Sequence, residues 1–520
     1  MRIITPINVT GPTTFTRAST ATYVTKAGLL ATAAVNELRP YYLPPEAHLL
    51  GVLLEPAATN LMLRSEDCTV APWAATISGT STRTNVAGTT GFGLLQAVAT
   101  SANGGLRQQI TSLVAAQRYA LSFYLESATA TVLVTFENGT SAFGSPHSVV
   151  IVPATGATSS LVGFTVTSYA WGAGRVYNLI TQPAASGAIA NIEWRIPTNG
   201  GTILLGRPQF EAGASATSYI PTVASSVTRA ADVMTGTGLA FSNVPENDYP
   251  QWSAGTYTLG TRRLYLRKVY EVIVASTTDN PAAGAALTVP SWLLIGSENR
   301  YKMFDQTIST QTAQATSIEA AVTPGGIVNA VAFFGLSGNR VTVTVDDLSE
   351  GIVYDTTKSL QDYTSIVDWY AYFFDDIVQR TDIVFLDLPS YGSATLAFTI
   401  EGLAAECGEV VFGRQKILGV SNYGTSISIQ DYSIKSRDAF GNTIITQRAF
   451  SKRADYDVTV ETAAVSAVQQ ALAAIRTTPT VFVGEEAKAE TIVYGFYRAF
   501  NIVLANPSVS DCTIEVEGLV

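Results

Sequence analysis

Residues 210–233 read FEAGASATSYIPTVASSVTRAADV and separate two strand-rich parts of the chain. The stretch is small and polar, has almost no strand or helix period, and carries Pro221 among Ser, Thr and Ala residues. New strand signals begin beyond it, near Tyr265. These features predict that the stretch closes one domain and that a second domain starts at residue 234.

Composition limits the classes of function. A chain of 520 residues predicts three or four domains. Only 14% of the residues are charged and the net charge is −10, which argues against a nucleic-acid binder because such proteins cluster Lys and Arg on one face. No apolar run approaches the roughly 20 residues that cross a bilayer, and the first residues lack the apolar core of a signal peptide. We therefore expect no membrane insertion, and synthesis in the cytoplasm.

The residues before the closing stretch predict an antiparallel sandwich. Short strand signals recur between residues 119 and 205, with many turns and no long helix. Residues 1–58 have little regular period and several prolines. We expect them to form an extended N-terminal arm packed on this first module, which spans residues 59–233.

Two groups of motifs bracket the first module. Residues 15–23 read FTRASTATY, residues 51–61 read GVLLEPAATNL, and residues 64–67 read RSED. Together with residues 209–233, they resemble the jelly-roll, carbohydrate-binding-type domains of phage tail and tail-fibre proteins. The resemblance implies a virion protein involved in host attachment.

The second module is predicted to span residues 234–416. Residues 341–345 read VTVTV, and this alternation predicts a half-buried strand. The order of the strands resembles galactose-binding-like sandwiches. Residues 369–374 read WYAYFF, which we interpret as a strand of the sandwich core; a subunit interface through Trp369, Tyr370, Tyr372 and Phe374 is the main alternative, and a sugar-stacking platform is a third.

The third module, residues 417–520, is predicted to contain a long hairpin and one helix. The hairpin joins residues 425–435 to residues 443–452, and the helix covers residues 462–476 and ends before Pro479. Hairpin, sheet and packed helix resemble the ring-forming domains of phage tail-tube, distal-tail and hub proteins, and residues 407–409, 423–425 and 448–453 resemble tail-associated phage proteins. The resemblance implies other tail proteins as partners and a homo-oligomer with ring or collar symmetry.

Signatures of catalysis are missing from the sequence. It has two histidines without metal-ligand spacing, no nucleophile elbow and no phosphate-binding loop. Asp375 and Asp376 could offer oxygens to Ca²⁺, which takes six to eight, but two neighbouring carboxylates do not define a site. The three cysteines are far apart, and we expect buried free thiols. We predict no catalytic residue, no metal site, no cofactor and no enzyme activity, although a glycosidase built from distant carboxylates stays open.

Glycan binding on a sandwich needs aromatic faces beside planar hydrogen-bonding groups. The residues of the first module that meet this description are Trp171, Arg175, Tyr177, Trp194 and Arg195. The fold expected overall is mainly β and multidomain, with jelly-roll and galactose-binding-like antiparallel sandwiches and a C-terminal β module with one packed helix. The expected function is that of a structural protein of a phage tail tip or baseplate; a host-glycan-binding adhesin and a polysaccharide-degrading enzyme are the alternatives.

Overall fold

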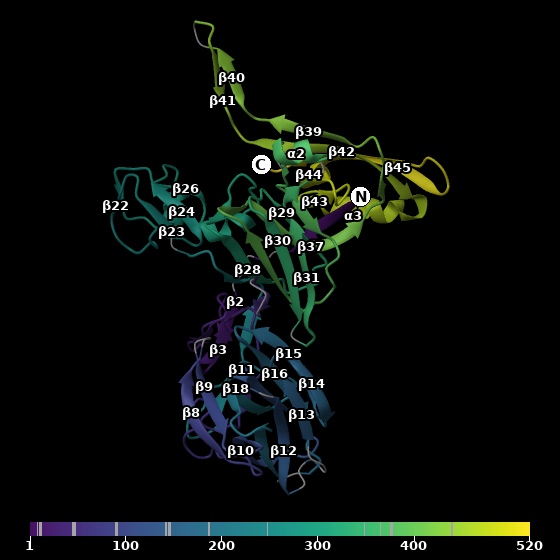
Figure 1. Cartoon of the computed structure of the whole chain (residues 1–520). Helices are drawn as coiled ribbons and strands as arrows, with labels where there is room; N and C mark the ends of the chain where they lie inside the picture. Colours follow the sequence, from purple (N-terminus) through teal and green to yellow (C-terminus); the bar gives the residue numbers. More distant parts are fainter. Residues whose placement is uncertain are drawn as a thin grey trace. The chain divides into compact units, whose positions relative to one another are not determined.

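The computed structural model describes the whole chain except residues 8, 10–12, 44–47, 89–91, 130, 141–142, 144–146, 186–187, 247, 348, 364–365, 375–377 and 438–439. Asp375 and Asp376 therefore lie outside the described residues. The chain divides into two compact units (Figure 1). The sandwich unit is Thr14–Thr235, and the large-sheet unit is Met1–Thr13 with Gly236–Val520. The sheets of both units are built from antiparallel strands and helices are few, so the predicted mainly β, multidomain fold class is confirmed.

Two sheets face each other in the sandwich unit. One has the order β15 (Thr165–Trp171), β16 (Gly174–Thr181), β11 (Tyr119–Ala128), β18 (Thr202–Ala212), β9 (Gly93–Ala99) and β8 (Ser81–Ala87). The other has the order β10 (Gly104–Leu113), β17 (Ala188–Ile196), β12 (Val132–Thr140), β13 (His147–Val152) and β14 (Ala157–Val162). Alternate side chains such as Phe123, Phe136 and Trp194 meet between the sheets in one apolar core.

The N-terminal arm and the closing stretch pair with each other. They form the ladders β7 (Ala58–Asn60) with β19 (Val227–Arg229) and β2 (Thr13–Thr16) with β20 (Val233–Gly236). The arm also forms the small hairpins β3 (Ala21–Val24) with β4 (Leu30–Ala33) and β5 (Pro40–Tyr41) with β6 (Gly51–Val52). Chain segments about 170 residues apart therefore close the sandwich unit together.

The first residues of the chain belong to the other unit. The large sheet has the order β34 (Ile383–Phe385), β29 (Ala330–Phe334), β37 (Glu409–Ile417), β1 (Arg2–Pro6), β43 (Thr480–Val483), β44 (Ile492–Val503), β45 (Val509–Gly518), β42 (Phe450–Glu461) and β38 (Val420–Ser421), with β39 (Ser426–Asp431) also paired to β42. Strand β1 lies between β37 and β43. The prediction that the arm packs on the first module as a whole is therefore wrong for residues 1–13, because Ile3 and Ile4 are buried in the large sheet.

The predicted boundary between residues 416 and 417 falls inside a strand. Strand β37 ends at Ile417 and pairs with both β29 and β1. Strands from the predicted second and third modules thus share one sheet and one unit. The sequence favoured two modules because each part has its own strand signals, whereas backbone pairing between them leaves no mark on side-chain periodicity.

A second sheet packs against one end of the large sheet. Its order is β21 (Gly238–Ser242), β28 (Ser317–Thr323), β35 (Thr395–Glu401), β30 (Arg340–Asp347) and β31 (Gly351–Ser359). Val341, Val343 and Val345 of β30 point into the core between the sheets, as their alternation predicts. The opposite face of β30 is also buried, since Thr342 and Thr344 hydrogen-bond to β31, so the strand is fully rather than half buried.

The predicted helix and long hairpin are confirmed. Helix α3 (Val465–Ala474) follows a 3₁₀ turn, η2 (Thr462–Ala464), and its buried Val468 and Leu472 pack on the large sheet. The hairpin runs from β39 through β40 (Ile434–Arg437) and β41 (Thr443–Thr446) into β42. Smaller elements complete this unit: β22 (Tyr257–Thr258), β23 (Arg262–Tyr265), β24 (Lys268–Val272), β25 (Ser276–Thr277), α1 (Pro281–Ala285), β26 (Trp292–Ser297), η1 (Asn299–Phe304), β27 (Thr312–Gln314), β32 (Gln361–Asp362), β33 (Val378–Gln379), β36 (Ala405–Cys407) and η3 (Ala489–Thr491).

The aromatic run WYAYFF is a helix and not a strand. It forms α2 (Trp369–Phe374), in which Trp369 stacks on Phe373 and Tyr370 packs on Phe374. Residues four apart are neighbours on a helix surface, so these pairs favour the helical backbone. The prediction of a core strand is therefore wrong, since these side chains are exposed and Trp369 is 77% accessible.

Candidate functional site

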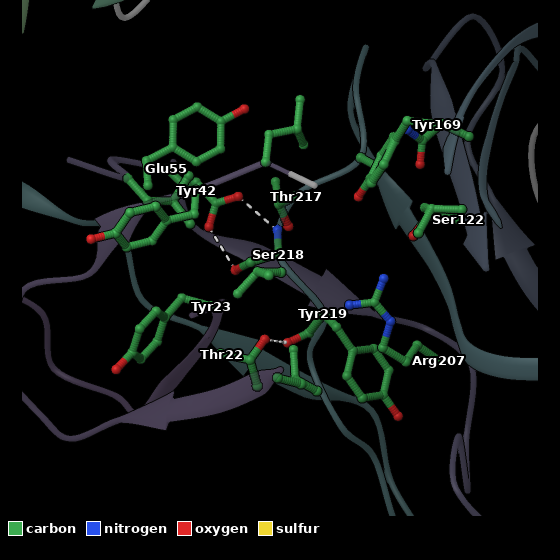
Figure 2. Close-up of a pocket in the computed structure, with 18 of the residues that line it drawn as sticks. Thr22, Tyr23, Tyr42, Glu55, Ser122, Tyr169, Arg207, Thr217, Ser218 and Tyr219 are labelled. Carbon is green, nitrogen blue, oxygen red and sulfur yellow. Dashed lines mark hydrogen bonds between the residues drawn. The ribbon is translucent and has the colours of Figure 1, made fainter. Parts of the chain in front are cut away.

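A pocket of about 220 Å³ lies in the sandwich unit, on the face of the β15–β16–β11–β18 sheet that points away from the core. The N-terminal arm and residues 216–219 of the closing stretch border it (Figure 2). Its described lining is rich in tyrosine and polar side chains: Thr22, Tyr23, Tyr41, Tyr42, Glu55, Ser122, Tyr169, Asn178, Arg207, Thr217, Ser218 and Tyr219.

Strand alternation places two small polar groups on the floor of the pocket. Ser122 of β11 and Asn178 of β16 are direct register partners. Their neighbours Phe123 and Tyr177 point into the core, so Ser122 and Asn178 point outward. Neither side chain hydrogen-bonds to a described residue, which leaves one hydroxyl and one amide available to a ligand.

Arg207 reaches the pocket through a bulge in β18. Ser122 pairs with Gln209 and Tyr124 pairs with Gly206, so two residues of β18, Arg207 and Pro208, face one residue of β11. Arg207 adopts a φ of 50°, a left-handed conformation that costs a non-glycine residue about 1–2 kcal/mol. Bulges redirect side chains and recur next to active sites. Here the bulge brings Arg207 onto the pocket face of the sheet.

Aromatic rings surround the guanidinium group of Arg207. Its central carbon lies 3.9 Å from the ring centre of Trp171, 5.1 Å from that of Phe92 and 6.0 Å from that of Tyr219. Trp171 is itself held by a 2.7 Å hydrogen bond from its indole nitrogen to the carbonyl of Gly28 in the arm. Cation–π contacts of this kind stabilise a desolvated cation by about 2 kcal/mol or more. The arm thus helps to hold the platform on which Arg207 rests.

The charge of Arg207 is buried without an acidic partner. The residue is only 9% exposed, and no carboxylate among the described residues forms an ion pair with it. Burial lowers the pKa of Arg207 to about 10, against which Tyr169 and Tyr219 act to raise it. The group is therefore still protonated at neutral pH. Figure 2 shows the guanidinium group pointing into the space between Ser122, Tyr169 and Tyr219.

A buried network of charged residues fastens the rim of the pocket. Asp232 accepts from Arg17 and Arg39, while Glu55 accepts from Arg39 and Arg229. Glu55 also accepts hydrogen bonds from the backbone and hydroxyl of Ser218 at 2.6 and 2.7 Å (Figure 2). The arm supplies Arg17, Arg39 and Glu55, and the closing stretch supplies Arg229 and Asp232. All but Arg39 lie in the motifs that resemble phage tail proteins.

The residues predicted to bind glycan do not form a surface. Trp194 and Tyr177 are fully buried in the sandwich core, and Trp171 is buried beneath Arg207. Arg195 is buried and pairs with Glu193 at 2.6 Å, and the half-buried Arg175 does not line the pocket. A ring without an exposed face cannot stack on a sugar, so the prediction of a binding site made of these five residues is wrong. Trp171 still bears on the pocket indirectly, by supporting Arg207.

Metal-binding groups, membrane-spanning helices and cysteines are the other features that could bear on function in the described part of the chain. No group of three or more His, Cys, Asp or Glu residues in the described ranges is placed to hold a metal ion. Of the described helices, none is long and apolar enough to cross a membrane. The three cysteines are buried free thiols, as predicted.

Comparisons with known proteins find neither a matching family model nor a matching curated protein. Among solved structures, the chain is similar to tailspike protein 4 of bacteriophage CBA120 (12% identity, 29% of this chain and 21% of that one, TM-score 0.20). It is similar to the CBM22-2 xylan-binding domain of Paenibacillus barcinonensis Xyn10C (14% identity, 30% and 98%, TM-score 0.20) and to a GH78 family rhamnosidase of Bacillus sp. GL1 (10% identity, 83% and 54%, TM-score 0.16). The chain spans about a fifth of the tailspike and about half of the rhamnosidase. At these TM-scores the likenesses carry no argument about ligand or activity.

Proposed function

We propose that this chain is a structural protein of a tailed-phage virion, part of the tail tip or baseplate, whose sandwich unit binds a saccharide on the host surface. The pocket supports the proposed saccharide binding, because Ser122, Asn178 and Arg207 present hydrogen-bonding groups beside tyrosine rings. The virion half rests on the resemblance of residues 15–23, 51–61, 64–67 and 209–233 to phage tail proteins.

The pocket suits a sugar better than an apolar ligand. Saccharides present C–H edges to aromatic rings and hydroxyl groups to small polar side chains. Tyr23 and Tyr169 border the pocket as half-buried rings, while the outward Ser122 and Asn178 supply both donors and acceptors. The volume of about 220 Å³ fits one sugar residue with the remainder of a chain outside.

The same lining favours binding over hydrolysis. Most glycosidases use two carboxylates on either side of the scissile bond. Glu55 is the sole carboxylate among the described lining residues, and Arg39 and Arg229 both bind its Oε2 atom. The alternative of a polysaccharide-degrading enzyme therefore finds no support in this pocket.

The large-sheet unit supports a role in assembly. Hairpin β40–β41 forms a two-stranded sheet whose residues are all exposed, including Ile434, Ile444 and Ile445, and Phe440 at its end is 91% accessible. An isolated two-stranded hairpin is marginal in water, so a partner chain would stabilise it. Exposed aromatic residues on α2, among them the predicted interface residues Trp369, Tyr370, Tyr372 and Phe374, favour the same role. We propose other copies of this chain and further tail proteins as the partners.

Binding of the full-length protein to an array of bacterial surface polysaccharides tests the proposed function. The parent should bind at least one polysaccharide, and the double variant Ser122→Ala/Asn178→Ala should bind it at least 10-fold more weakly. Thr158→Ala/Ser159→Ala is the matched control, because these residues are exposed on β14 of the same unit. If the folded parent binds no polysaccharide, the proposed saccharide binding is wrong and only the proposed assembly role remains. Cryo-microscopy of the virion would test that role by locating the large-sheet unit.

A further inference from the structure

Arg207 lines the pocket and forms no ion pair with a carboxylate among the described residues. In the network at its rim, three arginines meet Glu55 and Asp232, and Glu211 lies close enough to favour the charged form of Arg229. Each of these three arginines therefore has a carboxylate partner. Arg207 is not part of this network, and its Nε is buried without a hydrogen-bond partner in the described chain. Uncompensated buried charge is expensive, so its presence in a pocket points to a ligand.

The fold maintains this arrangement at some expense in stability. Arg207 occupies a left-handed backbone position in a bulge, and the central carbon of its guanidinium group lies over the rings of Trp171 and Phe92. A desolvated guanidinium group is suited to an anion that accepts two hydrogen bonds side by side, and a carboxylate is one of the anions that match its fork geometry. The neutral Ser122 and Asn178 on the neighbouring strands then face the rest of the ligand.

We propose that the pocket selects a saccharide carrying a carboxylate, a hexuronic or nonulosonic acid residue, and that Arg207 binds this carboxylate while Ser122 and Asn178 bind sugar hydroxyls. The inference rests on the proposed function and names its ligand class. It assigns discrimination between acidic and neutral sugars to one residue. Trp171 acts as a positioning residue, since it supports Arg207 without lining the pocket.

Calorimetric titration of the full-length protein tests the inference with matched ligands. The probes are oligosaccharides containing glucuronate, galacturonate or N-acetylneuraminate, each beside the same oligosaccharide with its carboxylate reduced to an alcohol. At least one acidic probe should bind 10-fold or more tightly than its reduced form, because a charge-assisted hydrogen bond contributes about 1.5–3 kcal/mol. Acetate and inorganic phosphate serve as small anions and should bind far more weakly than the acidic sugar.

Four variants assign the effect to residues. Arg207→Gln should weaken the acidic probe to the affinity of the reduced form and leave the reduced form unchanged. Arg207→Lys keeps the charge but not the fork, and should retain part of the preference. Ser122→Ala should weaken both forms by the same factor. Arg118→Gln removes an exposed charge from the same unit and should change neither. Near-ultraviolet circular dichroism of each variant establishes that the aromatic platform is intact.

The outcomes separate the two claims. Equal affinity for acidic and reduced probes, or an Arg207→Gln variant that keeps the preference, would overturn the inference while the saccharide pocket stands. Acetate or phosphate binding as tightly as the sugar would also overturn it, because the site would then serve any small anion. If no probe and no array polysaccharide binds the folded parent, the proposed saccharide binding fails together with the inference.

Discussion

Two buried arginine sites in the sandwich unit show how differently the same residue can be used. Arg39 has carboxylate partners on Glu55 and Asp232, whereas Arg207 has aromatic rings and an open pocket. The first arrangement joins the arm to the closing stretch; the second leaves a cation facing solvent-accessible space. A buried ion pair adds little net stability, but removal of one partner leaves the other charge buried and unpaired, which is strongly destabilising. Removal of a carboxylate partner of Arg39 should therefore destabilise the fold, whereas replacement of Arg207 removes a buried charge that has no carboxylate partner among the described residues.

Asp232→Asn should destabilise the sandwich unit by about 3–5 kcal/mol, because Arg17 and Arg39 both lose a buried carboxylate. Hydrogen exchange of strands β7 and β19, which this network brackets, measures the effect. Arg118→Gln is the control and should be neutral within about 0.5 kcal/mol. Unchanged exchange in Asp232→Asn would mean that backbone pairing alone closes the unit.

Glu409 in β37 gives a pH dependence to the large-sheet unit. Burial, with a smaller effect of Asp305, raises the pKa of Glu409 to about 9, although its carboxylate accepts a 2.9 Å hydrogen bond from the backbone of Gln306. Between the ordinary value of 4.5 and this folded value, the folded state binds more protons than the unfolded state, so the free energy of unfolding falls as pH rises.

Glu409→Gln should remove that dependence. The variant should be more stable than the parent at pH 8 and no less stable at pH 5, as measured by denaturant unfolding at both pH values. Glu515→Gln changes an exposed carboxylate of β45 and should leave the slope as in the parent. A parent whose stability does not decline between pH 5 and pH 8 would contradict the assignment.

Among the helices and strands, the sequence predicts those whose side chains follow a recognisable periodic pattern. Helix α3 and strand β30 follow from apolar periodicity, and the long hairpin follows from its paired strands. The run WYAYFF gives no clear pattern, because its aromatic residues would cover both faces of either a strand or a helix. The ring contacts between residues four apart favour the helix. The pocket was missed because Ser122 and Asn178 lie 56 positions apart and meet only through strand register. The Arg207-Pro208 pair inside a predicted strand is a local signal of the bulge, because proline cannot donate to the strand ladder.

The exposed hairpin β40–β41 should mediate self-association. Ile444→Ser/Ile445→Ser removes apolar area from its surface and should shift an oligomer toward the mass of a single chain in analytical ultracentrifugation. The matched control is Leu161→Ser/Val162→Ser on β14, where similarly exposed side chains lie in the sandwich unit. A parent that is already a single chain at high concentration would refute self-association through this hairpin.

On the scale of the whole molecule, the two units have separate cores and separate proposed tasks. The sandwich unit has the pocket, and the large-sheet unit has α3, the exposed hairpin and the aromatic helix α2. The closing stretch of distinct composition is predicted to end the first module at residue 233, and the sandwich unit ends at Thr235. It could not predict that residues 1–13 join the other unit, because strand β1 is recruited by backbone pairing with β37 and β43.

If the two units fold independently, a substitution that destabilises the large-sheet unit should not change saccharide binding by the sandwich unit. Leu472→Ala leaves a cavity beneath α3 and should lower the stability of the large-sheet unit by about 2–5 kcal/mol, while saccharide affinity stays within twofold of the parent. Gln469→Ala, on the exposed face of the same helix, should change neither. Denaturant unfolding followed together with saccharide binding measures both quantities, and a joint loss would indicate that the units are coupled.

We propose that the sandwich unit binds a saccharide between the arm and the β15–β16–β11–β18 sheet. The most direct test is a structure of the full-length protein determined with a saturating host oligosaccharide. Sugar density is expected in the pocket, within hydrogen-bond distance of Ser122, Asn178 and Arg207, with a tyrosine ring against a C–H edge. Sugar bound on another surface, with this pocket empty, would contradict it.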